Sequence, residues 1–319
     1  MESSGDIGIT SNITTPPSLQ YGSIALATMI SVIATVGNGL IILVIVKTRS
    51  LHTPTHYLIG TLSLADLLTG SIGNPLHLYA SFGPDDYKWC ALSYTVLSVF
   101  LMLSTLTVTC IAVERYIAIM HPFFYIEWMT IKKMCITIAS LCVFSVLVLA
   151  YLPVYYGAMV EHPDRCIFTL VIPSTLGVPI FTIVTLLCII TASIYLKILQ
   201  IARAQAKKML TMETGSNVSS TKSMKKETKT TIFLCFIVFY FICSWSLNIC
   251  ITLLDYANIT AKLFWWYVAM FLSISNSAIN PVLYGLGYQE YRRAIKRLMH
   301  NSLGNKTNVI DISITQTDT

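Results

Sequence analysis

Asp66 is an acidic residue in the middle of a long apolar stretch, where burying a charge is costly enough to require a partner or a function. Neutral polar side chains lie near the middle of other apolar stretches: Asn38, Ser104, Asn276, Ser277 and Asn280. Asn276 and Asn280 are four residues apart and would share one helix face. A carboxylate among neutral oxygens suits a hard monovalent cation or a water cluster, and plain hydrogen bonding between helices is the alternative.

A second candidate site is the charged triplet Glu114-Arg115-Tyr116, which ends an apolar stretch and is followed by Phe123. Charged residues at the end of a membrane helix usually just lie at the interface. Glu227 begins a later apolar stretch on the same side, however, and could pair with Arg115 across the bundle. Such an ion pair would join two helices.

A third candidate is the run from Asn280 to Tyr284. Pro281 has no N–H to donate, so a helix that passes through this run loses a backbone hydrogen bond and is able to kink. A kink at this position is a candidate hinge.

These side chains belong to a very apolar chain. Of its 319 residues, 55% are hydrophobic and 11% are charged, and its mean hydropathy is +0.68. Soluble domains carry about a quarter charged residues, and a membrane-spanning helix needs about 20 apolar ones. Seven segments meet that need and predict an all-α membrane bundle in one domain: 21–46, 57–81, 91–113, 134–160, 168–196, 230–254 and 263–284.

Basic residues predict the orientation, because they are retained on the cytoplasmic side during insertion. All but three of the 21 lysines and arginines lie at or beyond the same helix ends; the exceptions are Lys88, Arg165 and Lys262. The chain is therefore predicted to be a multi-pass protein of the plasma membrane with its amino terminus outside. Its net charge of +6 reflects this topology and contact with anionic membrane lipid.

The predicted organisation has three parts. Residues 1–20 form an extracellular amino terminus, residues 21–300 the seven-helix domain, and residues 301–319 a cytoplasmic tail. Residues 288–300 alternate bulky apolar with basic side chains, which predicts a short amphipathic helix on the membrane surface.

Two cysteines stand apart from the other seven. Cys90 opens the third segment and Cys166 lies in the loop before the fifth. Both fall on the outer side, which is oxidising, so we predict a disulfide that ties the loop to the helix end. On the same side, Asn12 lies in a glycosylation sequon farther from the membrane than the sequon at Asn258, and is the predicted glycosylation site.

Several function classes are disfavoured. Nucleic-acid binding would need basic residues interleaved with aromatic ones on a folded surface. An intramembrane enzyme would need a nucleophile with its base or a metal-ligand set, and His77 is the sole histidine within the segments. We therefore expect no catalytic residues. An ion-coupled transporter or channel that uses Asp66 is the main alternative, although its usual paired broken helices are absent from the sequence pattern.

Taken together, the motifs resemble the rhodopsin-like family of G-protein-coupled receptors. They occur in the family's order: Gly37-Asn38, the run Leu62-Ser63-Leu64-Ala65-Asp66, Cys90, Glu114-Arg115-Tyr116, Cys166 and Asn280 to Tyr284. The resemblance implies a receptor that converts binding of an extracellular ligand into outward movement of the sixth helix and activation of a heterotrimeric G protein. It also implies receptor kinases and arrestin as partners.

The resemblance assigns roles to individual residues. It implies that Glu114 and Glu227 hold Arg115 at rest and that activation frees it. Positions that match the cavity-lining tyrosines, the G-protein contact and the aromatic pair of the sixth helix are Tyr195, Tyr284, Phe123, Phe241 and Trp245. Positions that match the family's sodium site are Asp66, Ser104, Asn276, Ser277 and Asn280.

The ligand pocket carried over from the family is almost uncharged. It consists of Leu97, Ser98, Leu101, Met102, Trp245, Asn248, Ile249, Thr252, Trp266, Met270 and Ile274. Leu97 stands where a carboxylate anchors biogenic amines, and Ile274 where a lysine binds retinal, so neither ligand is expected. Such a pocket suits a lipid, an apolar molecule or a neutral polar ligand, and ordinary bundle core is the alternative. The acids of the outer loops leave room for a cationic peptide: Asp85, Asp86, Glu161, Asp164 and Asp255.

The sixth segment departs from the family pattern. The family commonly has Cys-Trp-x-Pro there, whereas the run from Phe241 to Leu247 keeps the Phe and Trp245 but has no proline. Alignment on Trp245 puts Glu227 at the family spacing, and alignment on Cys243 would put Ser244 in the tryptophan position. No subfamily follows from the sequence.

Overall fold

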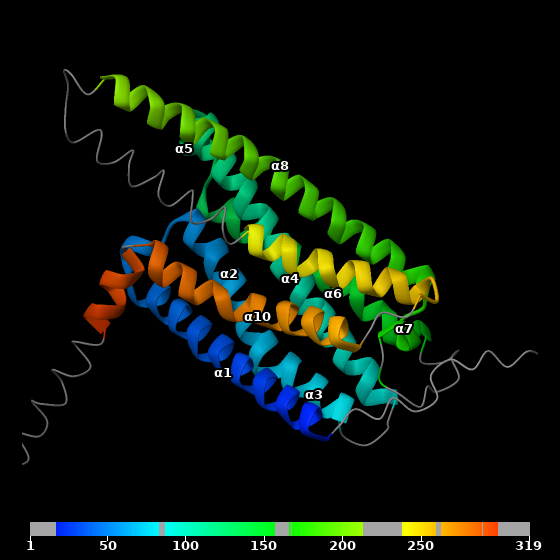
Figure 1. Ribbon diagram of the computed structural model, residues 1–319. Coiled ribbons are helices and arrows are strands. Elements are labelled where there is room, and N and C mark those ends of the chain that lie inside the picture. The colour runs from blue at the N-terminus through cyan, green and yellow to red at the C-terminus, as the bar shows by residue number, and fades with distance from the viewer. Residues whose placement is uncertain are drawn as a thin grey trace, which may run out of the picture.

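The chain folds as a bundle of long helices (Figure 1). A computed structural model describes residues 17–82, 87–156, 166, 168–212, 238–259, 263–288 and 290–298, and it contains no strand among them. The seven predicted spans correspond, in chain order, to α1 (Pro17–Lys47), α2 with α3 (Pro54–Leu68 and Asn74–Phe82), α4 (Tyr87–Met120), α6 (Ile131–Tyr156), α8 (Ser174–Met212), the helix Val238–Tyr256 and α10 (Leu263–Gly287).

Shorter elements connect these helices. A 3-10 turn, η1 (Arg49–Leu51), follows α1, and a π-helical turn, η2 (Thr69–Gly73), joins α2 to α3. The others are α5 (Pro122–Trp128), α7 (Phe168–Val171) and a helix at 290–298. The helix Val238–Tyr256 is called the sixth helix below. The predictions on Asn12, Glu227, Asp85, Asp86, Glu161, Asp164 and the tail from 301 lie outside the described residues.

Four described helices are long and apolar enough to cross a membrane: Gln20–Lys47, Lys88–Met120, Ser174–Ile201 and Val238–Tyr256. A fifth is added if Pro122–Trp128 and Ile131–Leu147, which are bent by 81° to each other, count as one span. Because α6 runs with the bundle, α5 lies across its end. The remaining two spans are the one that η2 divides and α10, which carries the polar run from Ser273 to Ser277.

One predicted segment boundary is wrong, and one predicted span is not a regular α-helix throughout. The fifth span does not begin at Phe168, because α7 ends at Val171 and α8 starts only at Ser174. Pro173 lies between them, and a proline lacks the N–H that would continue the helix. The second span is not one regular α-helix, since the π turn η2 interrupts it immediately before Asn74 in the chain.

The helices pack around α4, which contacts α2, α6 and α8, while α1 packs between α2 and α10 (Figure 1). At Gly37, α1 lies directly against Pro281 of α10. A Cβ placed on Gly37 would lie 2.9 Å from both Cβ and Cγ of Pro281. Only a residue without a side chain lets α1 approach the proline of α10 this closely.

We expect Gly37→Val to reduce the amount of folded receptor severalfold, because a branched side chain would push α1 away from Pro281. Surface expression and detergent-solubilised thermal stability measure this effect. Gly22→Val is the matched control, since no atom lies within 4 Å of a Cβ built there. Equal yields of the two variants would contradict the close packing.

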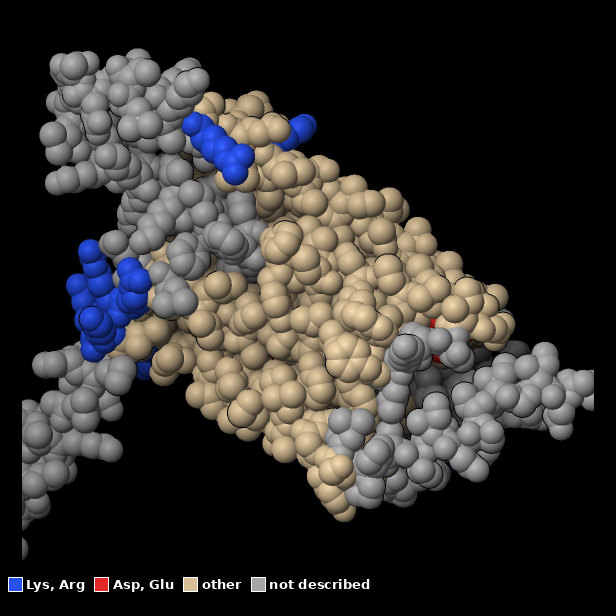
Figure 2. All heavy atoms as spheres, in the orientation of Figure 1, with Lys and Arg blue, Asp and Glu red and all other residues tan. Residues whose placement is uncertain are grey.

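The two ends of the bundle differ in charge. Lysines and arginines gather at the end where α5 and the helix at 290–298 lie, and a broad band of the visible face carries none (Figure 2). We call this end, with Lys132, Lys133 and the helix at 290–298, the basic end. The opposite end, with Cys90 and Cys166, is the disulfide end. This asymmetry is the one expected from a chain inserted with its basic loops in the cytoplasm.

Candidate functional site

Asp66 lies fully buried between three helices and accepts hydrogen bonds from two of them. Asn280 donates through Nδ2 over 2.7 Å, Ser277 donates through Oγ over 2.9 Å, and the Ser104 hydroxyl lies 3.5 Å away. These donors come from α10 and α4, whereas Asp66 belongs to α2. Four of the six predicted cluster residues therefore meet at one point.

The other two members of the predicted cluster lie beside this point. Asn38 donates from Nδ2 to the backbone oxygens of Ala34 and Ser277, each over 2.9 Å, so it reaches Asp66 only through Ser277. Asn276 is buried on α10, but no hydrogen bond joins it to Asp66 in the part of the chain that the structure describes. It is therefore the weakest member of the predicted set.

The oxygen atoms near Asp66 are of the kind that a small cation binds. The side-chain oxygens Oδ1 of Asn38 and Asn280 are buried and make no hydrogen bond among the described residues. Buried polar atoms normally have a partner, so these oxygens favour a bound cation or ordered water. The carboxylate of Asp66 and the hydroxyls of Ser104 and Ser277 add further oxygens, the ligand atoms that a hard cation prefers.

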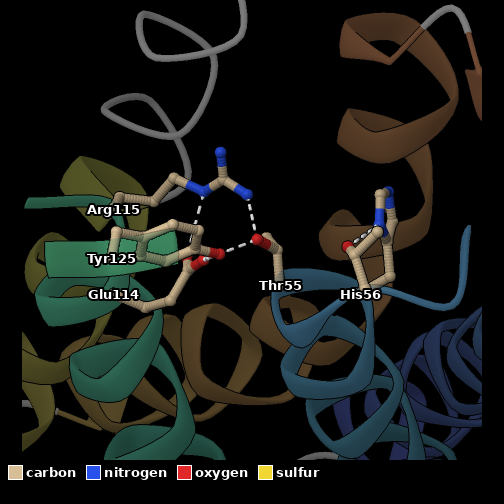
Figure 3. Close-up of polar contacts among 6 residues, drawn as sticks. Thr55, His56, Glu114, Arg115 and Tyr125 are labelled. Atoms are coloured by element: carbon tan, nitrogen blue, oxygen red, sulfur yellow. Dashed lines mark hydrogen bonds and ion pairs between the residues drawn. The ribbon is translucent and has the colours of Figure 1, made fainter. Parts of the chain in front are cut away.

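A second polar cluster lies at the basic end of the bundle (Figure 3). Glu114 is 2% exposed, and its carboxylate accepts hydrogen bonds from Thr55 over 2.7 Å and from Tyr125 over 2.5 Å. Arg115 Nε lies 3.1 Å from Glu114 Oε2, and its Nη2 donates to Thr55 Oγ1. The Thr55 hydroxyl thus bridges acid and base, and the guanidinium is fastened to α2 as well as to its neighbour on α4.

Local structure explains why these four side chains meet. Thr53 is extended and Pro54 occupies the first helical position, so α2 begins just before Thr55 and turns this residue toward α4. Pro122 likewise starts α5, which folds back under α4 and directs Tyr125 at Glu114. Burial, and then the hydrogen bond to Glu114, raise the pKa of Tyr125 to about 12, so its phenol stays a donor at physiological pH.

Sequence reasoning missed Thr55 and Tyr125. Glu227, the predicted second partner of Arg115, lies outside the described residues, so that pairing stays a prediction. The only signal for Tyr125 was its place one turn into a helix that Pro122 could start, and Thr55 had none. A hydroxyl at a helix start is common, and only the packing of α2 on α4 gives it a role.

The other predicted switch residues lie near this cluster or farther along the bundle. Tyr195 and Tyr284 are both buried in one apolar cluster, with Tyr116 packed against it. The ring of Tyr284 stacks on Tyr291 at 6.1 Å between centroids, and Pro281 lies inside α10. Farther along, Phe241 and Trp245 are neighbours on the sixth helix at 6.1 Å. Phe123 is 88% exposed at the basic end.

At the disulfide end, Cys90 and Cys166 form the predicted disulfide, with 5.5 Å between their Cα atoms. Three of the predicted pocket residues near it are buried, namely Met102, Ile249 and Thr252. Asn248 donates to the Ser273 hydroxyl over 3.2 Å, so its amide already joins the sixth helix to α10. The remaining predicted pocket residues are partly buried: Leu97, Ser98, Leu101, Trp266, Met270 and Ile274.

Two packing contacts bear on the predicted ligand pocket. Leu97 lies against η2, since a Cβ on Gly73 would be 2.8 Å from its Cδ2. Val171 and Ile172, which belong to the loop before α8, are buried in the same apolar cluster as Met102 and Ile249. This part of the loop therefore belongs to the same apolar cluster as two of the predicted pocket residues.

The family described as 7 transmembrane receptor (rhodopsin family) matches residues 37–284. The chain belongs to this family. The match extends from the glycine that meets Pro281 to the tyrosine that stacks on Tyr291, and thus includes both polar clusters.

Individual relatives are similar at moderate identity. Trace amine-associated receptor 9 of Mus musculus is 27% identical over 300 residues, which cover 89% of this chain and 85% of the relative. Trace amine-associated receptor 365 of Petromyzon marinus is 29% identical over 277 residues, covering 81% and 74%. Sphingosine 1-phosphate receptor 1 of Danio rerio is 26% identical over 275 residues, covering 82% and 74%.

The family membership confirms the predicted seven-helix receptor fold and function. The protein is a multi-pass membrane receptor that takes an extracellular ligand and signals through a G protein. The comparisons give no support to a transporter or channel. Two of these relatives' names refer to trace amines and the third to sphingosine 1-phosphate, so the names do not define one ligand class.

Proposed function

We propose that the described arrangement is the resting state of this receptor, with Glu114, Thr55 and Tyr125 holding Arg115 at the basic end. The observation that carries this proposal is the set of contacts on Glu114, a buried carboxylate with two hydroxyl donors and an adjacent guanidinium. A buried charge leaves such a setting only if its partners are replaced. Release of Arg115 is then an all-or-none step that a ligand biases by binding one state better.

In this proposal the basic end faces the cytoplasm and the amino terminus is outside. Outward movement of the sixth helix opens a cavity lined by Tyr195 and Tyr284, and the exposed Phe123 contacts the G protein there. The serines and threonines of the loop before the sixth helix and of the tail are the sites where receptor kinases would act and arrestin would bind.

We propose a ligand that is apolar or neutral where it enters the bundle. In support, Met102 and Ile249 share an apolar cluster, and Leu97 brings no charge to the place where a carboxylate would anchor an amine. Polar recognition is left to Asn248, Ser98 and Thr252. A cationic peptide held by the outer acids is the second candidate, favoured by Asp255 at the end of the sixth helix.

A sodium ion at Asp66 is part of the proposal. The Asp66 carboxylate, the hydroxyls of Ser104 and Ser277 and the free oxygens of Asn38 and Asn280 are the residues that would hold it. The ion would supply a positive charge for a carboxylate that otherwise has only neutral donors. No group of three or more His, Cys, Asp or Glu side chains that could bind a metal occurs among the described residues.

One screen tests the function and the ligand class together. The receptor would be expressed with a panel of chimeric G proteins and exposed to lipids, amines, nucleosides and peptides. We expect an apolar or neutral compound to activate it, and Arg115→Ala to remove more than about nine-tenths of the response at equal surface expression. Arg203→Ala, at an exposed arginine of α8, is the matched control and should respond normally.

The outcomes separate the two claims. A response that persists in Arg115→Ala with every G protein would contradict the role of Arg115. Activation by amines alone, with full dependence on Arg115, would leave the switch in place and overturn the neutral ligand.

A further inference from the structure

Cys166 and the residues from Phe168 to Ile172, called the loop segment here, make several contacts with the bundle. Cys166 forms the disulfide with Cys90 of α4. The Tyr94 hydroxyl of α4 lies 3.5 Å from the carbonyl oxygen of Cys166. The Phe168 ring packs edge-on against Tyr94, with 5.3 Å between ring centroids, and at a tilt against Phe181 of α8, with 5.5 Å between centroids. The segment therefore joins the third and fifth spans of the bundle.

The end of the same segment is part of the core. Val171 is 2% exposed and Ile172 is 5% exposed, and both belong to the apolar cluster that contains Met102 and Ile249. Burial of two large aliphatic side chains stabilises this position of the segment. The segment thus fills space between the helices and does not lie over them as a flexible loop would.

Two hydrogen bonds tie the segment to the outermost turn of the sixth helix. Thr169 donates to the carboxylate of Asp255, and Tyr256 donates to the carbonyl oxygen of Ile172 over 2.7 Å. The Tyr256 ring also lies against Gly177 of α8, where an added Cβ would be 2.8 Å from its Cζ. Asp255 and Tyr256 are consecutive, so one turn of helix makes all these contacts.

The sixth helix has no proline between Val238 and Tyr256, although a proline is common at this place in the family. Sharp kinks in helices occur mainly at proline or at comparable breaks, so this helix is expected to move as a rigid rod. Outward movement of its basic end then displaces its other end as well. A displacement of a few ångström exceeds what a hydrogen bond tolerates.

We propose that Thr169, Asp255 and Tyr256 form a latch that holds the sixth helix in its resting position, and that activation requires this latch to open. They act as positioning residues, because their effect on the G protein passes through the helix. The proposal rests on the resting-state assignment made above from Arg115. It adds that the loop before α8 restrains signalling through the end of the helix opposite the G protein.

Basal signalling of single variants tests the latch. Thr169→Val and Tyr256→Phe each remove one hydrogen bond and keep the shape of the side chain, and we expect each to raise basal signalling about three- to tenfold at equal surface expression. The matched controls are Thr182→Val and Tyr79→Phe. The Thr182 hydroxyl donates to the backbone oxygen of Val178 in the same helix, and Tyr79 is half exposed beside Trp89.

Exchanging the side chains at positions 169 and 255 distinguishes loss of the latch from a general loss of stability. Asp255→Thr should raise basal signalling, and the pair Thr169→Asp with Asp255→Thr should bring it back toward the original level, because the hydroxyl and carboxylate have only changed places. Hydrogen exchange of the amides at 251–256 in the purified receptor should rise in Thr169→Val and Tyr256→Phe, and not in the controls.

The assay includes Glu114→Gln so that two failures can be told apart. If Glu114→Gln raises basal signalling while the latch variants match their controls in signalling and in hydrogen exchange, the latch is wrong and the resting state stands. If Glu114→Gln has no effect either, the resting-state assignment is wrong and the latch is overturned with it.

Discussion

Replacing Glu114 by glutamine is expected to raise basal G-protein signalling by about tenfold or more. The substitution removes the negative charge that pairs with Arg115 and weakens the hydrogen bonds from Thr55 and Tyr125. A hydrogen bond to a charged group contributes about 1.5–3 kcal/mol, and about 1.4 kcal/mol changes an equilibrium tenfold. Loss of one such interaction from the resting state alone is therefore enough.

The measurement is agonist-independent signalling per receptor at the cell surface, with each chimeric G protein in turn. Glu127→Gln is the control, since Glu127 is an exposed carboxylate on α5 near the same end. Thr55→Val and Tyr125→Phe should give smaller increases, because each removes one donor and leaves the Glu114 charge in place. Basal signalling of Glu114→Gln at the level of Glu127→Gln would mean that the cluster does not restrain Arg115.

Comparison of the three variants also separates the two contacts of Arg115. If its ion pair with Glu114 dominates, Thr55→Val will have little effect. If its hydrogen bond to Thr55 of α2 dominates, Thr55→Val will approach Glu114→Gln, because it frees the guanidinium from the neighbouring helix. The same comparison with Glu227→Ala tests the pairing that the sequence predicts across the bundle.

The helices were predicted well because the apolar character of each span is summed over many residues. Each span needs about 20 apolar residues, and no single residue decides the outcome. Boundaries depend on single residues instead: Pro173 ends α7, and the segment that was predicted to extend to residue 168 is divided there. The π turn at Thr69–Gly73 has only a weak signal: Gly70, Gly73 and the following Pro75 disfavour a regular helix but do not specify a π turn.

The polar clusters were predicted unevenly, for a physical reason. Asp66 was conspicuous because a charge in an apolar stretch needs partners, and three of them are now at hydrogen-bonding distance. Thr55 and Tyr125 were not conspicuous, because polar side chains at helix ends have many uses. Their role depends on the angle of α5 and the depth of α2, which are tertiary properties. The latch of Thr169 with Asp255 likewise joins residues 86 positions apart.

Sodium is expected to stabilise this receptor through Asp66, and Asp66→Asn is expected to abolish that effect. A ligand at about ten times its Kd stabilises the folded state by about 1.4 kcal/mol, which raises the Tm of a protein of this size by a few degrees. Asparagine keeps the size of the side chain but removes the charge that a cation needs. The measurement is the Tm of purified receptor in sodium chloride and in choline chloride at equal ionic strength.

The control for this experiment is Ser71→Ala, at an exposed serine on η2 whose hydroxyl donates to the backbone oxygen of Leu67 in the preceding helix α2. It should keep the sodium-dependent rise in Tm. A rise of the same size in Asp66→Asn would show that sodium acts elsewhere. The free oxygens of Asn38 and Asn280 would then belong to a water cluster. Loss of the rise in Asp66→Asn alone assigns the cation to the carboxylate, since Asn280 and Ser277 can still bond to the amide oxygen.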